Sequence, residues 1–309
     1  MPEALTLFGS TILLRPYVFI FLAMYILAGT THMGWRRTLV YIPIGYGLAW
    51  ISEYSSIHWG FPYGDYYYIQ DTMGSELWVM GVPFMDSLSY VFLSYCSYAT
   101  AIFLLSPVCF KGWGVFILET RSLRRGWSTL VLGAFLFVLL DIIIDPVALQ
   151  GYRWFLGQIY GYRHPGIYFG IPMSNFGGWL LVGFVLVGAL QRLDHISLLE
   201  DAAPGSYQPW PWLCLTGPAL YFGVLAFNLS VTFWIGEHLL GTVGLLILLY
   251  TGLMAVFFTL YKQARVSRGD VTRHLGDFPL SRATRLLDSR LFGDAGGAPE
   301  NPSHPGALS

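Results

Sequence analysis

Long apolar runs recur along the chain, and short polar or turn-rich segments separate them. A helix that crosses a bilayer needs about 20 mostly apolar residues. Seven segments satisfy this requirement: 16–34, 38–57, 82–105, 127–146, 170–190, 212–236 and 238–261. The pattern therefore predicts an all-α fold, in which residues 1–265 form a polytopic membrane domain with about seven transmembrane helices.

The composition agrees with this prediction. Of the 309 residues, 55% are hydrophobic, 17% are aromatic and only 11% are charged, a profile that is rare among soluble domains of this length. Cys96, Cys109 and Cys214 lie far apart and form no CxxC pair, so they indicate neither a disulfide framework nor a zinc site. We expect no metal and no other cofactor.

Basic residues are distributed unevenly between the two sides of the predicted bundle. The odd-numbered segments are followed by Arg36, Arg37, Lys111, Arg121, Arg124, Arg125, Arg192, Lys262, Arg265 and Arg268. The opposite side carries only Arg15, Arg153 and Arg163. By the positive-inside rule, we expect the N-terminus outside, the C-terminus in the cytoplasm and the protein in the inner (cytoplasmic) membrane.

Residues 266–309 lose the apolar character and end in a stretch rich in Gly, Pro, Ala and Ser. This composition predicts a polar, disordered cytoplasmic tail. Within it, the basic segment PLSRATRLLDSRLF at 279–292 could lie on anionic lipid as an amphipathic helix or stay solvated with the rest of the tail.

Two aspartates, Asp141 and Asp145, interrupt the fourth apolar segment. An acid in the hydrocarbon core costs about 2.5–3.5 kcal/mol on insertion scales, so such residues usually have a buried partner or a function. Their i, i+4 spacing places both on one helix face. Repulsion and burial favour one neutral carboxyl, which could donate a proton. Alternatively, the pair only forms hydrogen bonds to neighbouring helices or to Arg153.

Further polar residues fall in the same predicted leaflet as the aspartate pair. Glu53 is expected at the outer end of the second segment, and Asp86 and Asn175 in the first turns of the third and fifth. Asp141, Asp145, Glu53 and Asp86 are therefore the candidate catalytic residues. For Glu53 and Asp86 a simple helix-end role is equally compatible with the sequence, because helix ends meet water and an acid in a first turn is favourable.

Aromatic residues are dense in the two loops beside these acids. The candidates for an apolar wall whose ring faces could stabilise a cation are Tyr63, Tyr66, Tyr68, Trp154, Tyr168 and Trp179. An interfacial aromatic belt would account for part of them. Both loops also repeat the order acid, Gly/Tyr loop, Gly-x-Pro, next helix, although Gly-x-Pro commonly begins helices. If the repeat is real, the two loops face each other across one cavity.

The sequence lacks the motifs of several known kinds of active or cofactor-binding site. The histidines show no HxxxH or HxxHH spacing of the kind that membrane di-iron desaturases use, and no G-x-G-x-x-G follows a predicted strand. A G-x-S-x-G nucleophile elbow is also absent. The segment DIIID is similar to half of a prenyltransferase motif, but the second acid-rich motif is missing.

Four segments carry a family resemblance: EYSSIHWGFPYGDYYY, GVPF, DIIIDPVALQGYRWF and GIYFGIPMSNFGGW. They resemble the signature regions of the carotenoid-biosynthesis membrane protein family, which includes bisanhydrobacterioruberin hydratase and the bacterial carotenoid 1,2-hydratases. The resemblance spans about residues 45–190. The sequence departs from the family at Trp154, where two tryptophans are usual, and at Asp86, where an apolar or proline-bearing helix start is expected.

The resemblance implies a cofactor-independent hydro-lyase that adds water to the terminal isopropylidene double bond of an acyclic carotenoid, giving a tertiary alcohol. On this reading Asp141 or Asp145 donates the proton and Glu53 or Asp86 orients water. Asn175 fixes a carboxyl or the water, and the cation is lined by Tyr66, Tyr68, Tyr168 and Trp179. The expected partners are a lipophilic carotenoid and membrane lipid, not nucleic acid, and GGWLLVG at 177–183 leaves a homo-oligomer possible.

Two other classes of function remain open from the sequence. The acids could relay protons or bind cargo in a proton-coupled transporter or a binding protein for a lipophilic ligand. The same cation chemistry could also serve an isomerase or cyclase that acts on an isoprenoid end group. A sealed apolar cavity around Asp145 would favour cyclisation, whereas an open, wet cavity would favour hydration.

Overall fold

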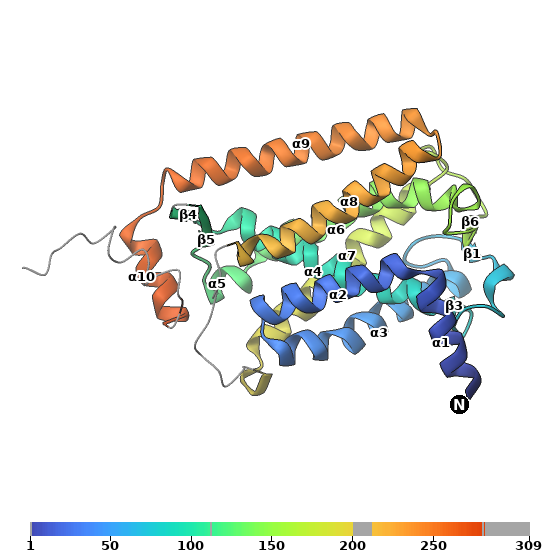
Figure 1. The fold of residues 1–309 in the computed structure, drawn as a ribbon, viewed down its shortest axis with the longest axis horizontal. Coiled ribbons are helices and arrows are strands. Elements are labelled where there is room, and N and C mark those ends of the chain that lie inside the picture. The colour runs from blue at the N-terminus through green and yellow to red at the C-terminus, as the bar shows by residue number, and fades with distance from the viewer. Residues whose placement is uncertain (1, 112, 200–211, 280, 282–309) are drawn as a thin grey trace, which may run out of the picture.

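The computed structural model describes residues 2–111, 113–199, 212–279 and 281, and helices dominate it (Figure 1). The helices are α1 (Pro2–Leu14), α2 (Pro16–His32), α3 (Trp35–Trp59), α4 (Phe84–Leu105), α5 (Arg121–Arg124), α6 (Trp127–Leu149), α7 (Met173–His195), α8 (Thr216–Trp234), α9 (His238–Gln263) and α10 (Arg268–Asp277). The strands are β1 (Tyr66–Tyr68), β2 (Trp78–Val79), β3 (Val82–Pro83), β4 (Val108–Lys111), β5 (Gly114–Ile117) and β6 (Tyr160–Tyr162).

Each of the seven predicted segments is helical in the structure. Among the described residues, α4, α6, α7, α8 and α9 are long and apolar enough to cross a membrane by themselves. The pair α1 and α2, which bends by 90° at Arg15, would make a sixth span. Helix α3 has 25 residues but carries Arg36, Arg37 and Glu53, and it is not among these spans. The fold is that of a helical, polytopic membrane protein, and the count of seven spans stays a prediction.

Helix α4 forms the centre of the bundle and packs against α2, α3, α6 and α8. In its most apolar 18 residues, 83% are buried, compared with 6% in α9, which lies along the outside of the bundle (Figure 1). Helices α6 and α7 approach closely at Gly183, where an added Cβ would lie 3.3 Å from the Cα of Ala134. This glycine of the GGWLLVG segment therefore supports packing within the chain.

A buried ionic cluster holds the end of the bundle that carries α5 and α10. Arg124 contacts Glu119 at 2.6 Å and Asp194 at 3.3 Å, and Arg125 contacts Asp194 at 2.7 Å. Burial alone would raise the pKa of Glu119, but the charges of Arg124 and His32 outweigh it and lower this pKa to about 2. The stabilisation is therefore present above about pH 4.5 and is lost as the pH falls toward 2.

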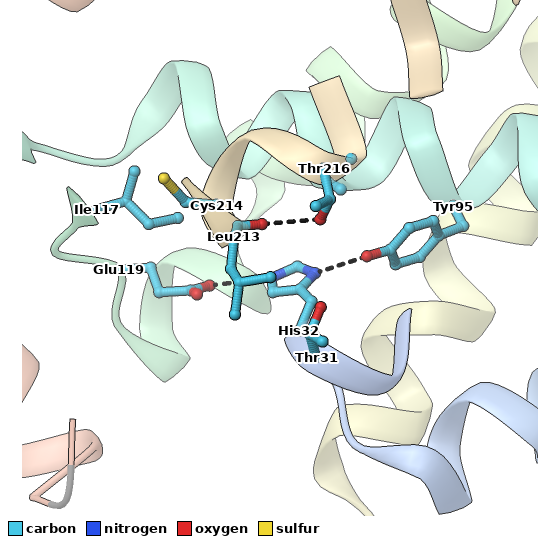
Figure 2. Close-up of a pocket in the computed structure, with 10 residues that line it drawn as sticks. Thr31, His32, Tyr95, Ile117, Glu119, Leu213, Cys214 and Thr216 are labelled. Carbon is cyan, nitrogen blue, oxygen red and sulfur yellow. Dashed lines mark hydrogen bonds and ion pairs between the residues drawn. The ribbon is translucent and has the colours of Figure 1, made fainter. Parts of the chain in front are cut away.

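Figure 2 shows the small pocket beside this cluster, where the ring of His32 lies between Glu119 and Tyr95. The pocket has a volume of about 20 Å³, which is room for about one water molecule. It is too small for an organic ligand, so the pocket belongs to the ionic framework of this end.

The first part of the predicted tail is folded, so the expectation of disorder is wrong for Arg268–Asp277. Ser267 and Asp270 form a capping box at the start of α10, and His274 is fully buried and shares a 2.7 Å hydrogen bond with the carbonyl of Glu119. The sequence missed this helix because its stability depends on a contact made 155 residues away. The basic segment 279–292 lies almost entirely outside the described residues.

We predict that Arg124→Ala lowers the free energy of unfolding by about 3–5 kcal/mol, because Glu119 and Asp194 would then share a buried site without this counter-charge. Thermal unfolding in detergent micelles measures the loss. The matched control is Arg273→Ala, because Arg273 pairs with Asp270 at the surface with a side chain that is 70% exposed. The control should change stability by about 0–1 kcal/mol, and equal losses in both variants would contradict the prediction.

A candidate active site between two aromatic loops

Strands β1 and β6 join the two aromatic loops at the end of the bundle opposite the ionic cluster (Figure 1). They pair antiparallel, with Tyr66 opposite Tyr162 and Tyr68 opposite Tyr160. Because side chains alternate along a strand, these four tyrosines share one face, while Tyr67 lies on the other and is 43% exposed. The four tyrosines line a single cavity. The two loops therefore meet at one cavity, as predicted, but they lie side by side as paired strands and do not face each other across it.

The cavity collects residues from both halves of the chain. Its volume is about 100 Å³. Nine of the eleven predicted site residues line it: Glu53, Tyr63, Tyr66, Tyr68, Asp86, Asp141, Asp145, Asn175 and Trp179. Tyr90, Tyr160, Tyr162 and Ser89 also line it and were not among the predicted site residues. None of the described residues in the lining is basic, so the four carboxyls cannot all be ionised without a severe electrostatic cost.

The two aspartates of α6 have different surroundings. Asn175 Nδ2 donates to Asp141 Oδ2 at 2.8 Å and to Asp145 Oδ2 at 3.1 Å. Asp145 also accepts hydrogen bonds from the hydroxyls of Tyr162, at 2.7 Å, and Tyr160. Asp141 Oδ1 is buried and has no hydrogen-bond partner among the described residues. Several donors favour an ionised Asp145, and the bare oxygen of Asp141 can carry a proton or meet a ligand.

Arg153 is not the partner of this aspartate pair. Its guanidinium forms an ion pair with Glu237 and donates to the carbonyl of Ile235, at the start of the α8–α9 turn. The purely structural alternative for Asp141 and Asp145 therefore loses its basic partner. What remains for the pair is the amide of Asn175 and the phenols of β6.

The second pair of acids lies across the cavity on α3 and α4. Glu53 is 1% exposed and accepts a hydrogen bond from the hydroxyl of Ser87. Asp86 is in the first turn of α4, as predicted, and its Oδ2 accepts from the Tyr68 hydroxyl at 2.7 Å. Glu53 does not end its helix, because α3 continues to Trp59. The helices that flank the first loop thus supply Glu53 and Asp86, and those that flank the second loop supply Asp141, Asp145 and Asn175.

The tyrosines of β1 and β6 act as neutral hydrogen-bond donors. Burial raises their pKa values above the ordinary range for a phenol, and nearby carboxyls raise them further: Glu53 for Tyr66, Asp86 for Tyr68, and Asp145 for Tyr160 and Tyr162. A phenol that stays protonated can hold a carboxylate without adding charge to the cavity.

Aromatic rings form the remaining wall. Trp179 stacks on Tyr90 with 4.9 Å between ring centroids and an interplanar angle of 21°, and it lies 4.7 Å from the Phe137 ring. Tyr66 lies within 6.3 Å, centroid to centroid, of the rings of Tyr68, Tyr160 and Tyr162. Such ring faces attract a cation.

Tyr168 was predicted to line the site, but it lines neither this cavity nor the second cavity described below. Helix α6 does not end before Pro146 but continues to Leu149. Proline has no N–H, so the carbonyl of Ile142, four residues earlier, lacks its helical partner. The Tyr168 hydroxyl donates to this carbonyl at 3.2 Å. Tyr168 therefore stabilises the helix that carries both aspartates.

Trp154 lines a second cavity beside the first, also of about 100 Å³. The two cavities share several wall residues, including Asp86, Leu93, Ala148 and Tyr160. The indole N–H of Trp154 donates to the carbonyl of Val147 at 3.0 Å, which fixes the ring against the last turn of α6. The predicted site residues thus occupy two adjoining spaces.

The family model of the carotenoid biosynthesis protein matches residues 12–251, a range that contains both loops and the whole lining of both cavities. The chain belongs to the carotenoid biosynthesis protein family. Membership gives this membrane protein a role in carotenoid biosynthesis and is consistent with an enzymatic site. No curated protein and no solved structure shows significant similarity to it.

Two adjacent glycines of this carotenoid biosynthesis protein allow a matched test of the site. A Cβ at Gly178 would lie 2.7 Å from the carbonyl oxygen of Pro62 and 2.7 Å from Cδ1 of Tyr63, whereas a Cβ at Gly177 would meet no atom of the described residues within 4 Å. We predict that Gly178→Ala displaces the Tyr63 loop and destabilises the protein by about 1–3 kcal/mol.

Gly177→Ala is the control and should be neutral or stabilising by about 0.5–1 kcal/mol, because alanine favours a helix. Thermal unfolding in detergent compares the two variants. If the two variants unfold at the same temperature, the close contact of Gly178 with Pro62 and Tyr63 does not stabilise the protein, and the prediction is wrong.

Proposed function

We propose that this carotenoid biosynthesis protein adds water to the terminal isopropylidene double bond of an acyclic carotenoid and forms a tertiary alcohol. One observation carries the proposal: Asp141 has a buried oxygen without a hydrogen-bond partner among the described residues, one helical turn from Asp145, whose carboxylate accepts three hydrogen bonds. A proton donor beside a stabilised anion, within an aromatic wall, suits a reaction that passes through a carbocation.

In the first step the Asp141 O–H bond breaks and its proton bonds to the less substituted alkene carbon. The alkene π electrons form the new C–H bond, and the other carbon becomes a tertiary cation. The carboxylate of Asp145 and the ring face of Trp179 stabilise this positive charge. Asn175 holds both aspartates in register through its two hydrogen bonds.

In the second step the oxygen of a water molecule bonds to the cation. The water loses a proton to Asp86 or Glu53, and this acid then passes a proton through cavity water to the carboxylate of Asp141, so that both carboxyls return to their starting states. The net change is the addition of one water molecule, and no metal, nucleotide or flavin enters the balance. Asp86 suits the role of base because Tyr68 already orients its carboxylate at 2.7 Å.

The cavity favours hydration over cyclisation. Its volume of about 100 Å³ has room for several water molecules, and its lining includes four carboxyls and the hydroxyls of Tyr68 and Ser89. A cyclase or isomerase must keep water from the same cation. A lining that is apolar throughout would support that rival, whereas this lining mixes carboxyls and hydroxyls with apolar side chains.

A transporter is the rival from another class. Transport sites commonly lie near the bilayer midplane, where both sides of the membrane can reach them. Here the carboxyls gather at one end of the bundle, and the pocket at the other end is separate and has room for only about one water molecule. With the N-terminus outside the inner membrane, as the basic residues indicate, the site opens toward the outer leaflet.

We predict that Asp141→Asn lowers the rate of hydration by about 10²–10⁴-fold, because the amide cannot supply the proton. Asp145→Asn should also abolish hydration while the protein stays in the membrane, because the anion that stabilises the cation is lost. Product formed in membranes with equal amounts of each variant measures both effects. Asp71→Asn, in the exposed loop at the same end of the bundle, is the control and should keep normal activity. Normal hydration by Asp141→Asn would refute its role as proton donor.

Expression in a host that accumulates lycopene tests the reaction class. We expect pigments that have gained one or two water molecules, according to whether one or both ends react, when they are analysed by mass. In deuterated water each hydrated end should also gain one deuterium on carbon that does not exchange, because the proton of Asp141 comes from solvent. Pigments that are isomerised or cyclised without a gain in mass would support the rival enzymes, and unchanged pigments would oppose all three.

A further inference from the structure

The second cavity differs in chemistry from the carboxyl-lined one. Its walls come from α2, α4, α6, α8 and the loop between α6 and β6, and most of its side chains are apolar, including Val18, Phe92, Leu156, Val224 and Phe227. We call this space the apolar arm. We propose that the apolar arm binds the hydrocarbon chain next to the reacting end group, and that the rest of the chain enters the bilayer between α2 and α8. This inference rests on the proposed function.

The apolar arm is continuous with the site of the carboxyls. Leu93 of α4 and Ile144 and Ala148 of α6 line both cavities, and Asp86 and Tyr160 stand at the junction. A molecule with its end group beside Asp141 would therefore place the atoms that follow in the arm. A flat, apolar chain with one reactive end fits this division into a polar part and an apolar part.

The mouth of the arm is built from aromatic rings of two helices. Tyr17 stacks on Phe227 with 5.4 Å between centroids, and Phe21 meets Phe227 edge-on at 5.7 Å. All three side chains line the arm and are partly exposed. They consequently offer ring faces and edges to a conjugated chain that crosses from the arm into lipid.

The polar residue Asn228 does not change the character of the arm. It is 6% exposed, and its Nδ2 donates to the carbonyl of Val224 on the same helix at 2.9 Å. Trp154 also lines the arm, and its indole N–H donates to the carbonyl of Val147, so it offers no free donor to a ligand. The arm thus provides packing and ring contacts rather than hydrogen bonds, which is what a hydrocarbon chain requires in a membrane, where lipid tails compete equally for apolar surfaces.

Val224→Phe tests this inference because Val224 is 2% exposed and lines the arm but not the carboxyl cavity. The larger ring should fill the arm. We expect hydration of a full-length acyclic carotenoid to fall at least tenfold, with a similar fall in the pigment that copurifies with the protein. Hydration of a short acyclic isoprenoid with the same end group should change less than twofold, because that molecule ends before the arm.

The control is Val185→Phe on α7, where the side chain is 46% exposed on the outer surface. It should leave both substrates and the copurifying pigment within twofold of the unmodified protein. If Val224→Phe lowers the unfolding temperature, Phe227→Ala at the partly exposed mouth replaces it, with the same tenfold loss of copurifying pigment expected.

The outcomes separate this inference from the proposed function. Pigment that copurifies with the unmodified protein and is lost in Val224→Phe, without hydration of either substrate, would support the apolar arm and overturn the hydratase. Normal hydration of the full-length carotenoid by Val224→Phe would overturn the arm and leave the hydratase standing. Recovery of lipid acyl chains in place of pigment from the unmodified protein would also overturn the arm.

Discussion

The pairing of β1 with β6 is the contact on which the site depends. It joins loops that are about 90 residues apart in the chain and turns Tyr66, Tyr68, Tyr160 and Tyr162 to one face. The four acids stand on α3, α4 and α6, and α4 packs directly against both α3 and α6. With the strand pairing, the hydroxyls of one sheet reach Asp86 on one side and Asp145 on the other. Helix packing brings the acids together, and the two short strands add the phenols that hold Asp86 and Asp145.

The buried acids have different kinds of partners at the two ends of the bundle. At the α5 end, Glu119 and Asp194 are neutralised by arginines, and full ion pairs of this kind leave little capacity for proton transfer. At the site end, the described lining of the cavity has no arginine or lysine, and neutral phenols and one amide hold the carboxyls. The first arrangement fixes structure, and the second suits the proton transfer that we propose.

The sequence predicted the helices and most of the cavity lining because both depend on local patterns. Apolar length located the segments, and i, i+4 spacing placed Asp141 and Asp145 on one face. The wrong predictions concern residues whose role depends on contacts with distant parts of the chain. The Tyr168 hydroxyl donates to the carbonyl of Ile142, which has no helical partner because of Pro146. Helix α10 is held by the hydrogen bond between His274 and the carbonyl of Glu119. Tyr160 and Tyr162 were missed, although their alternation around Gly161 is typical of a strand.

On the proposed reaction, the two cavities give the two reactants separate routes. Water reaches the carboxyls from the loops, and the hydrocarbon arrives through the apolar arm. A tertiary cation can be captured by water or can lose a proton to a base and return to an alkene. Asp86 and Tyr160 at the junction are hydrogen-bonded on the polar side, and the arm beyond them offers mainly apolar side chains. The carbon chain beyond the cation therefore meets few bases, while the cation itself meets water, and this geometry favours the alcohol.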